Sequence, residues 1–243
     1  MFFLAPLAVL SLPAVILAAA AVIPAVFLLV KVYQADKIEK EPPALIWSLA
    51  GLGVLSTFCA IVTETIGDSL LQQYLPEGSL SYNIWMYFII VALSEEGFKY
   101  LFLHLKTWNS REFNYQFDGV VYAVSVGAGF ALFENLEYVF SYGLATAAVR
   151  AVTAVPGHVC FAVFMGTWYG GAKRYANCGE REKSGLYSFM ALLIPVLMHG
   201  SYDFIASSES AASSAVFLIF IILMFYLSWR TVSIDSAKDE YIG

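Results

Sequence analysis

Long apolar runs recur along nearly the whole chain, and most polar residues gather between them. About 20 helical residues cross a hydrocarbon core at roughly 1.5 Å per residue, so each run is long enough to span a membrane. The hydropathy predicts seven membrane-spanning helices, approximately over residues 4–30, 44–65, 84–105, 118–140, 145–169, 185–206 and 213–229. The connections are short, so we expect a single transmembrane domain over residues 1–243.

Composition supports this class, because 60% of the residues are hydrophobic, only 13% are charged and the mean hydropathy is +0.71. A soluble domain is normally about half apolar and a quarter charged. We therefore predict an all-α, polytopic membrane protein. The first run contains no Lys or Arg before Lys31, so it lacks the basic start of a signal peptide and is interpreted as a retained span. Cys59, Cys160 and Cys178 form no regular set, so we expect no disulfide framework.

Basic residues predict the orientation, since cytoplasmic loops carry the excess of Lys and Arg. Eleven of the 13 basic residues fall in alternate connections and the C-terminal tail: Lys31, Lys37, Lys40, Lys106, Arg111, Lys173, Arg174, Arg181, Lys183, Arg230 and Lys238. The loops 66–83, 141–144 and 207–212 carry none. We therefore expect the N-terminus outside the cell and the C-terminus in the cytoplasm.

Ionisable side chains inside the predicted spans are the strongest indication of function, because such groups are costly in a bilayer and are usually functional or paired. Four consecutive spans, within residues 84–206, contain them. They hold, in chain order, Glu95, Glu96 and Lys99, then Glu134, Asn135 and Tyr138, then Arg150 and His158, and last His199 and Asp203.

Helix geometry predicts two pairs within this set. Glu95 and Lys99 are four residues apart and share a helix face, and the same spacing lets Asp203 orient the imidazole of His199. Glycines at small-residue spacing in the spans 118–140 and 145–169 allow the helices to approach closely. Counted from the predicted outer ends, the polar residues can share one pocket in the middle to outer half of the membrane.

Such a pocket suits hydrolysis. A carboxylate can take a proton from water, and a histidine can assist this step or stabilise an oxyanion. The same residue types can hold a zinc ion, which lowers the pKa of bound water to about 7. The chain shows no Ser/His/Asp set and no H-E-x-x-H motif.

Other interpretations stay open on the residues alone. One alternative is that the Glu95–Lys99 and His199–Asp203 pairs serve only to fix the packing of the helices. Arg150 is as consistent with a structural role as with a functional one. A proton-coupled transporter or channel also holds acids and histidines in mid-membrane, and a membrane scaffold or receptor is a third class. We interpret Glu64 and Asp68, near the outer end of the span 44–65, as exposed.

The order of the motifs resembles the PrsW family of bacterial intramembrane proteases. The matching residues lie in residues 84–206 and read Glu95-Glu96-x-x-Lys99, Phe133-Glu134-x-x-x-Tyr138, a span with His158, and His199-x-x-x-Asp203. The family shares a superfamily with the CAAX prenyl endopeptidases, whose first motif carries Arg, so the lysine favours the PrsW branch.

The resemblance implies a multi-pass protease of the bacterial plasma membrane that cleaves membrane-anchored proteins. Its expected partners are the lipid bilayer and a single-pass anti-sigma factor, and no nucleic-acid partner is expected. The resemblance implies that this substrate is cut outside the cytoplasm, as the first step of regulated intramembrane proteolysis. The family was first described as metalloproteases, whereas the CAAX relatives imply water activated by glutamate without metal.

We therefore assign expected roles to the site residues. Glu95 is the general base, Glu96 supports it, Glu134 and His158 complete the water site, and His199 stabilises the oxyanion with Asp203 orienting it. Lys99, Tyr138, Asn135 and Arg150 are expected to support these groups. If a divalent metal such as zinc is bound, Glu95, His158 and His199 are its expected ligands.

Overall fold

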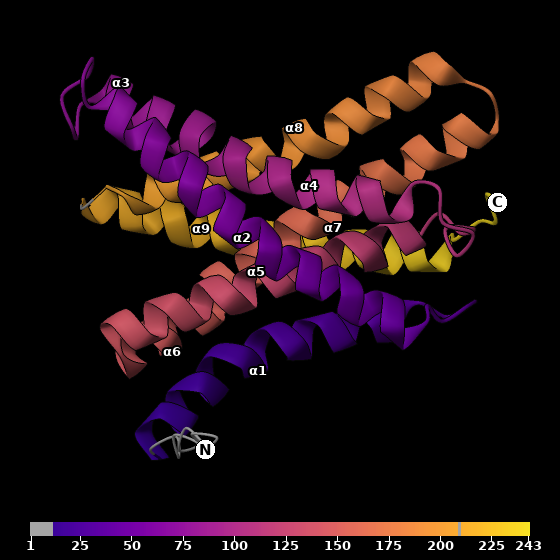
Figure 1. Cartoon of the computed structure of the whole chain (residues 1–243), viewed down its shortest axis with the longest axis horizontal. Helices are drawn as coiled ribbons and strands as arrows, with labels where there is room; N and C mark the ends of the chain where they lie inside the picture. Colours follow the sequence, from indigo (N-terminus) through magenta and orange to yellow (C-terminus); the bar gives the residue numbers. More distant parts are fainter. Residues whose placement is uncertain (1–11, 209) are drawn as a thin grey trace, which may run out of the picture.

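The computed structural model describes residues 12–208 and 210–243, and this part of the chain is a bundle of helices (Figure 1). Its elements are α1 (Leu12–Ala35), α2 (Pro43–Leu71), α3 (Leu80–Ile84), the π-helix η1 (Trp85–Ala92), α4 (Leu93–Thr107), α5 (Asp118–Tyr142), α6 (Leu144–Val152), α7 (Ala154–Asn177), α8 (Arg181–Ala206) and α9 (Ala211–Ala237). The predicted all-α polytopic architecture is confirmed.

Six helical segments in the described residues are long and apolar enough to cross a membrane: α1, α2, α5, α6 with α7, α8 and α9. The remaining predicted span, 84–105, lies within the continuous helical segment formed by α3, η1 and α4. Three charged residues of the candidate site, Glu95, Glu96 and Lys99, lie in this segment and lower its hydropathy. The first predicted span also includes residues 4–11, which lie outside the described residues.

The predicted span 145–169 lies within one candidate span, Leu144–Asn177, but this span is broken, because α6 and α7 meet at Thr153. Pro156 lacks the N–H group that would bond the carbonyl of Val152 in a continuous helix, so the chain breaks before it. In the first turn of α7 the proline costs no hydrogen bond. Gly143, with φ of +84°, turns the chain between α5 and α6. The short α6 consequently lies beside the C-terminal half of α5 and carries Arg150 there.

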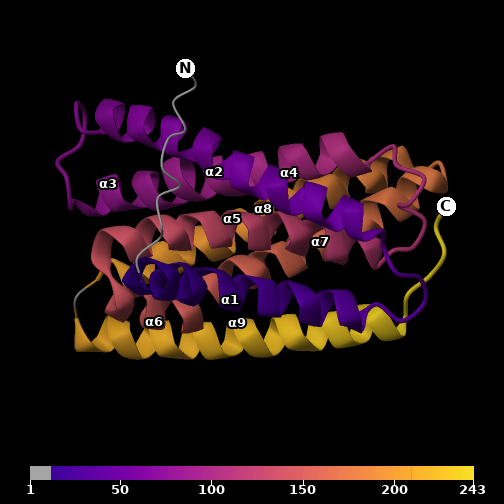
Figure 2. The same cartoon turned by 60° about the horizontal axis from the view of Figure 1, so that its bottom comes forward.

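Helix α5 is the centre of the bundle, and it packs against α1, α2, α4 and α7 (Figure 2). Its contact with α7 is close because glycines, which have no side chain, lie on both helices where they meet. A Cβ atom added to Gly119 would lie 2.7 Å from the carbonyl oxygen of Gly166, and one added to Gly166 would lie 2.5 Å from that of Gly119. The small residues identified in the sequence therefore mark a real helix–helix contact, as expected of backbones that must approach closely.

Helix α2 crosses α5 at a second close contact. A Cβ atom on Gly53 would lie 2.0 Å from the carbonyl oxygen of Val126, and one on Gly129 would lie 2.0 Å from that of Ala50. From this crossing the two helices diverge toward the end of the bundle that carries α3 and α6, in both views (Figures 1 and 2).

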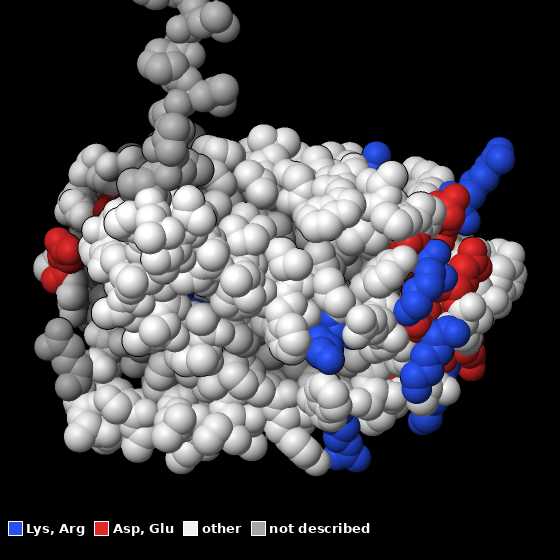
Figure 3. Space-filling model, turned by 90° about the horizontal axis from the view of Figure 1, so that it is seen from below, with Lys and Arg blue, Asp and Glu red and all other residues white. Residues whose placement is uncertain are grey.

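The basic loops gather at the opposite end of the bundle, as the charge pattern predicted. The α1–α2, α4–α5 and α7–α8 connections lie there with the C-terminus, and most Lys and Arg side chains surround them (Figures 1 and 3). A buried polar group stabilises this end, since the single hydroxyl proton of Tyr122 is shared between two acceptors, Glu41 Oε2 at 2.7 Å and the Glu112 carbonyl oxygen at 3.0 Å. Burial raises the pKa of the Glu41 carboxyl to about 7, against the lowering effect of the Tyr122 hydroxyl.

Candidate active site

Lys99 is the cation at the centre of the polar cluster. Its Nζ atom lies 3.2 Å from Glu95 Oε2 and 2.7 Å from Glu96 Oε1, so one ammonium group contacts both adjacent carboxylates. This is possible because residues three and four positions apart on a helix are neighbours. All three side chains are buried, with 2–5% of Lys99 and Glu95 exposed and none of Glu96. The predicted Glu95–Lys99 pair is confirmed, and Glu96 shares the same cation.

His158, on α7, joins this cluster to a second one. Its Nδ1 atom lies 3.2 Å from Lys99 Nζ, and its Nε2 atom lies 2.7 Å from Glu134 Oε2. An ammonium group can only donate hydrogen bonds, so Nδ1 must accept and the ring proton sits on Nε2, which donates to Glu134. The structure therefore assigns His158 as a neutral imidazole with a fixed tautomer.

Arg150, on α6, holds Glu134 from the other side. Its Nη2 atom donates to Glu134 Oε2 at 2.8 Å and its Nε atom donates to Asn135 Oδ1 at 3.1 Å, while the guanidinium lies 3.9 Å from the ring centroid of Tyr138. Asn135 in turn donates to the Ala21 carbonyl oxygen at 3.0 Å. The four residues form one network, in which Arg150 pairs with Glu134 and anchors α6 to α5.

His199, on α8, presents both ring nitrogens to carboxylates. Its Nδ1 atom lies 3.0 Å from Glu96 Oε1 and its Nε2 atom lies 3.2 Å from Asp203 Oδ2. Because a carboxylate only accepts, the doubly protonated ring is the form that makes both contacts. The predicted His199–Asp203 pair is confirmed. The two histidines thus have different electrostatic roles, His158 neutral beside a lysine and His199 cationic between two acids.

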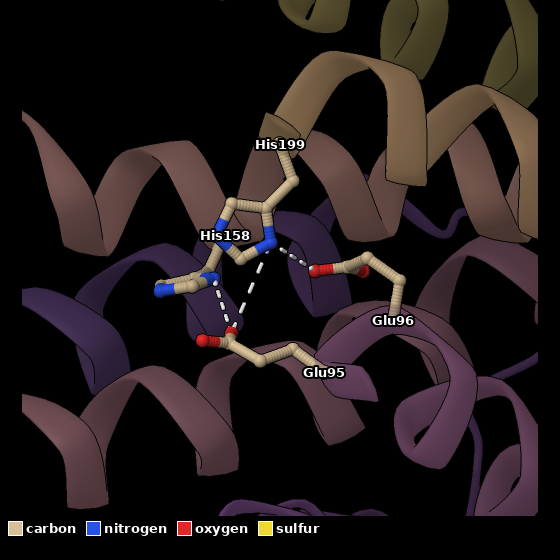
Figure 4. Close-up of side chains that lie close together, drawn as sticks. All are labelled: Glu95, Glu96, His158 and His199. Atoms are coloured by element: carbon tan, nitrogen blue, oxygen red, sulfur yellow. Dashed lines mark hydrogen bonds and ion pairs between the residues drawn. The ribbon is translucent and has the colours of Figure 1, made fainter. Parts of the chain in front are cut away.

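The two imidazoles and two carboxylates converge on one point (Figure 4). Glu95 Oε2 lies 4.0 Å from His158 Nδ1 and 3.8 Å from His199 Nδ1, and the two imidazole rings are perpendicular with centroids 5.1 Å apart. Glu95 and Glu96 come from α4, His158 from α7 and His199 from α8. Three helices therefore have to be packed in the observed rotation for the site to exist.

A cavity of about 720 Å³ leads from this point to the end of the bundle that carries α3 and α6. It lies in the space opened by the divergence of α2 and α5, with η1 and α8 as further walls. The cavity is lined by Glu95, Glu134, Arg150, His158, His199 and Asp203 among others, whereas Glu96 and Lys99 are not part of its wall. A molecule in the cavity can therefore touch Glu95 and not Glu96.

The interpretation of Glu64 as exposed is wrong. The side chain is half-buried and lines the same cavity from α2. Thr57, Ala60, Ile61, Glu64 and Thr65 line it together, at the spacing of one helix face. That spacing is visible in the sequence, but nothing in the sequence tells which neighbour the face meets.

The donor set fits a metal ion. Glu95, Glu96, His158 and His199 each offer one ligand atom, and these atoms all lie within 4.8 Å of one another. Carboxylate oxygens and imidazole nitrogens are typical ligands of zinc. The Lys99 ammonium contacts Glu95, Glu96 and His158, so a metal ion at this point would compete with a cation that the fold itself provides.

A polytopic helical bundle with paired carboxylates and imidazoles at the base of a cavity defines a membrane-embedded enzyme whose site is suited to acid–base or metal-assisted hydrolysis. Comparison with known proteins gives the family. A family described as "PrsW family intramembrane metalloprotease" matches residues 41–229. The chain therefore belongs to the PrsW family, and it is an intramembrane protease and a multi-pass bacterial membrane protein.

Curated relatives agree over most of the chain. The chain is 30% identical to Protease PrsW of Clostridioides difficile (strain 630) over 229 residues, which cover 92% of this chain and 93% of the relative. It is 32% identical to Protease PrsW of Oceanobacillus iheyensis and 31% identical to that of Bacillus subtilis (strain 168), each time over 79% of this chain and 83% of the relative. No solved structure matches the chain. The family decides between the protease and the transporter, channel or scaffold that the residues alone left open.

Proposed function

We propose that the chain hydrolyses peptide bonds of membrane-anchored proteins in the cavity between α2, α5 and α8, with Glu95 as the general base. The observation that carries this proposal is that Glu95 lines the cavity and faces both imidazoles, whereas its neighbour Glu96 lies behind the wall. A water molecule beside Glu95 would meet a carboxylate held by Lys99 at 3.2 Å. The buried setting strengthens each of these interactions.

The residues can carry both halves of the reaction. Glu95 takes a proton from water as the water oxygen bonds to the carbonyl carbon of the substrate. The positive charge of the His199 imidazolium, whose N–H groups face Glu96 and Asp203, stabilises the resulting oxyanion. Glu95 then passes the proton to the leaving amine as the carbon–nitrogen bond breaks. Asp203 and Glu96 keep His199 cationic, and Lys99 positions Glu95 without contacting the substrate.

Glu134 and His158 form a second acid–base pair in the lining of the same cavity. The Nε2–H of His158 donates to Glu134, and Arg150 pairs with the same carboxylate oxygen. In this arrangement His158 places a neutral imidazole next to Lys99 and completes the polar surface that surrounds the water. Tyr138 and Asn135 act through Arg150, which contacts both.

The family description raises the alternative of metal catalysis. In that case Glu95, His158 and His199 would hold a zinc ion, which would activate the bound water and polarise the scissile carbonyl. A test measures zinc in the purified wild type and in the His199→Ala protein, and activity with and without 1,10-phenanthroline. About one zinc per wild-type chain, lost in the variant, and chelator-sensitive cleavage would support metal catalysis. Cleavage at the wild-type rate by metal-free protein would support glutamate alone.

The substrate that we propose is a single-pass anti-sigma factor, cut on its extracytoplasmic side. The resemblance to the family suggests it, and the position of the cavity supports it, because the cavity opens at the end of the bundle opposite the basic loops. By the positive-inside rule that end faces outward, with the C-terminus in the cytoplasm. A cysteine in the α7–α8 loop that reacted with an impermeant reagent from outside intact cells would contradict this orientation.

Reconstituted protein tests the function. The wild type and the Glu95→Gln variant are mixed in liposomes with a single-pass substrate, and the products are mapped by mass spectrometry. We expect cleavage near the outer end of the substrate helix, and a rate at least about a hundredfold lower for Glu95→Gln, as for loss of a general base. Glu77→Gln, an exposed carboxylate on the same side, serves as the matched control. Equal rates for Glu95→Gln and wild type would overturn the proposal.

A further inference from the structure

Glu64 is a carboxylate in the cavity that the proposed chemistry does not use. It lies on the face of α2 that forms one wall, and the other four residues of this face, Thr57, Ala60, Ile61 and Thr65, are uncharged. In the described part of the chain its Oε1 atom is buried and has no hydrogen-bond partner. None of the ion pairs between described residues includes Glu64.

Asp68, the next acidic residue on α2, has hydrogen-bond partners for its carboxylate. Asp68, one turn further along α2, accepts hydrogen bonds from Gln72 at 3.1 Å and from the Tyr82 hydroxyl. These bonds tie the outer ends of α2 and α3 together, so Asp68 has a structural role. Glu64 has no comparable partner, although an unpaired carboxylate away from water costs free energy.

The described residues that line the cavity provide no unpaired cation for Glu64. Arg150 is already paired with Glu134 and stacked on Tyr138. The imidazolium of His199 already lies between Glu96 and Asp203. Lys99 contacts Glu95 and Glu96 behind the wall. The cavity therefore carries more acidic than basic groups. The cation that Glu64 lacks has to come from the molecule that enters the cavity.

We propose that Glu64 is a specificity residue that binds a Lys or Arg side chain of the substrate close to the scissile bond. The inference rests on the proposed function, since it assumes that the substrate chain lies in this cavity. Glu64 and Glu95 belong to different helices with fixed positions, so the distance between the recognised cation and the bond that is cut is also fixed. The preferred substrates are membrane-anchored chains with a basic residue at one defined position near the outer membrane surface.

The test uses a series of single-pass substrates that differ only in the position of one lysine, each paired with the same chain carrying glutamine there. For each pair the ratio of the kcat/KM values is measured with wild type, Glu64→Gln, Glu64→Lys and the control Glu77→Gln. We expect the wild-type ratio to favour lysine by about tenfold or more at one or two adjacent positions, since about 1.4 kcal/mol of differential binding is a tenfold effect. Glu64→Gln should bring the ratio close to one, and Glu64→Lys should reverse it in favour of the glutamine chain, because the introduced lysine repels a lysine of the substrate.

The outcomes separate this inference from the function on which it rests. A wild-type ratio near one at every position would overturn the role of Glu64 while leaving the protease intact, and this measurement does not depend on any variant folding. A preference for lysine that survives in Glu64→Gln would also overturn it. Failure of the wild type to cut any substrate in the series would overturn the proposed function and the inference with it.

Discussion

The Nζ atom of Lys99 lies 3.2 Å from Nδ1 of His158, so a cation on α4 decides which ring nitrogen of a histidine on α7 carries the proton. The same ammonium holds Glu95 and Glu96. One lysine thereby sets the charge and orientation of three other side chains in the proposed site.

Replacing Lys99 with methionine should damage stability as well as activity. The variant keeps a side chain of similar length but leaves two buried carboxylates without their cation, which typically costs about 3–5 kcal/mol for a broken buried pair. Denaturant unfolding in detergent measures the change. Lys106→Met, an exposed position on the same helix, is the control. An unfolding midpoint for Lys99→Met equal to that of the control would show that Lys99 is not needed as a counter-ion.

Glu96→Gln and Glu95→Gln should fail in different ways. Glu96 accepts from both Lys99 and His199 and lies behind the cavity wall, so its loss should lower the unfolding temperature more than the loss of Glu95. Glu95 lines the cavity, so its loss should lower kcat more. Differential scanning fluorimetry and the cleavage assay, run on both variants, check the two rankings. The reverse order in kcat would assign the general base to Glu96.

The crossing of α2 and α5 should not tolerate a methyl group. A Cβ atom on Gly53 would lie 2.0 Å from the Val126 carbonyl oxygen, whereas one on Gly51 would meet nothing within 4 Å. We expect Gly53→Ala to destabilise the fold by about 1–3 kcal/mol or more, as overpacking does. Gly51→Ala, the matched control two residues away, should be neutral or slightly stabilising, because alanine favours a helix. Similar unfolding temperatures for the two variants would contradict the close crossing.

The Glu41 carboxyl should make stability depend on pH. Burial raises its pKa from 4.5 to about 7 in the folded protein, so the folded state binds the proton more tightly than the unfolded state. The contribution to stability is complete below pH 4.5 and is lost as the pH rises through about 7. Glu41→Gln removes this dependence, so its unfolding temperature should rise relative to wild type between pH 5 and pH 8. Glu182→Gln, an exposed carboxylate at the same end, should show a constant difference.

Much of the fold could be predicted from hydropathy, because a membrane span needs length and apolar composition and both are visible in the chain. Pairs within one helix could be predicted for a similar reason. The spacing of four residues places Glu95 beside Lys99 and His199 beside Asp203 whatever the neighbouring helices do, and the structure contains both pairs. The alternation of basic loops likewise needs only the order of the spans.

Only the tertiary structure decided which of these groups meet across helices. The contacts of Lys99 with His158 and of His199 with Glu96 depend on the rotation and depth of α4, α7 and α8, and hydropathy defines neither. For the same reason Glu64 is interpreted as exposed on the sequence alone, whereas the structure places it in the wall of the cavity. The chain by itself determined that acids and imidazoles lie within apolar spans, and the packing of α4, α7 and α8 against one another determined that they form one site.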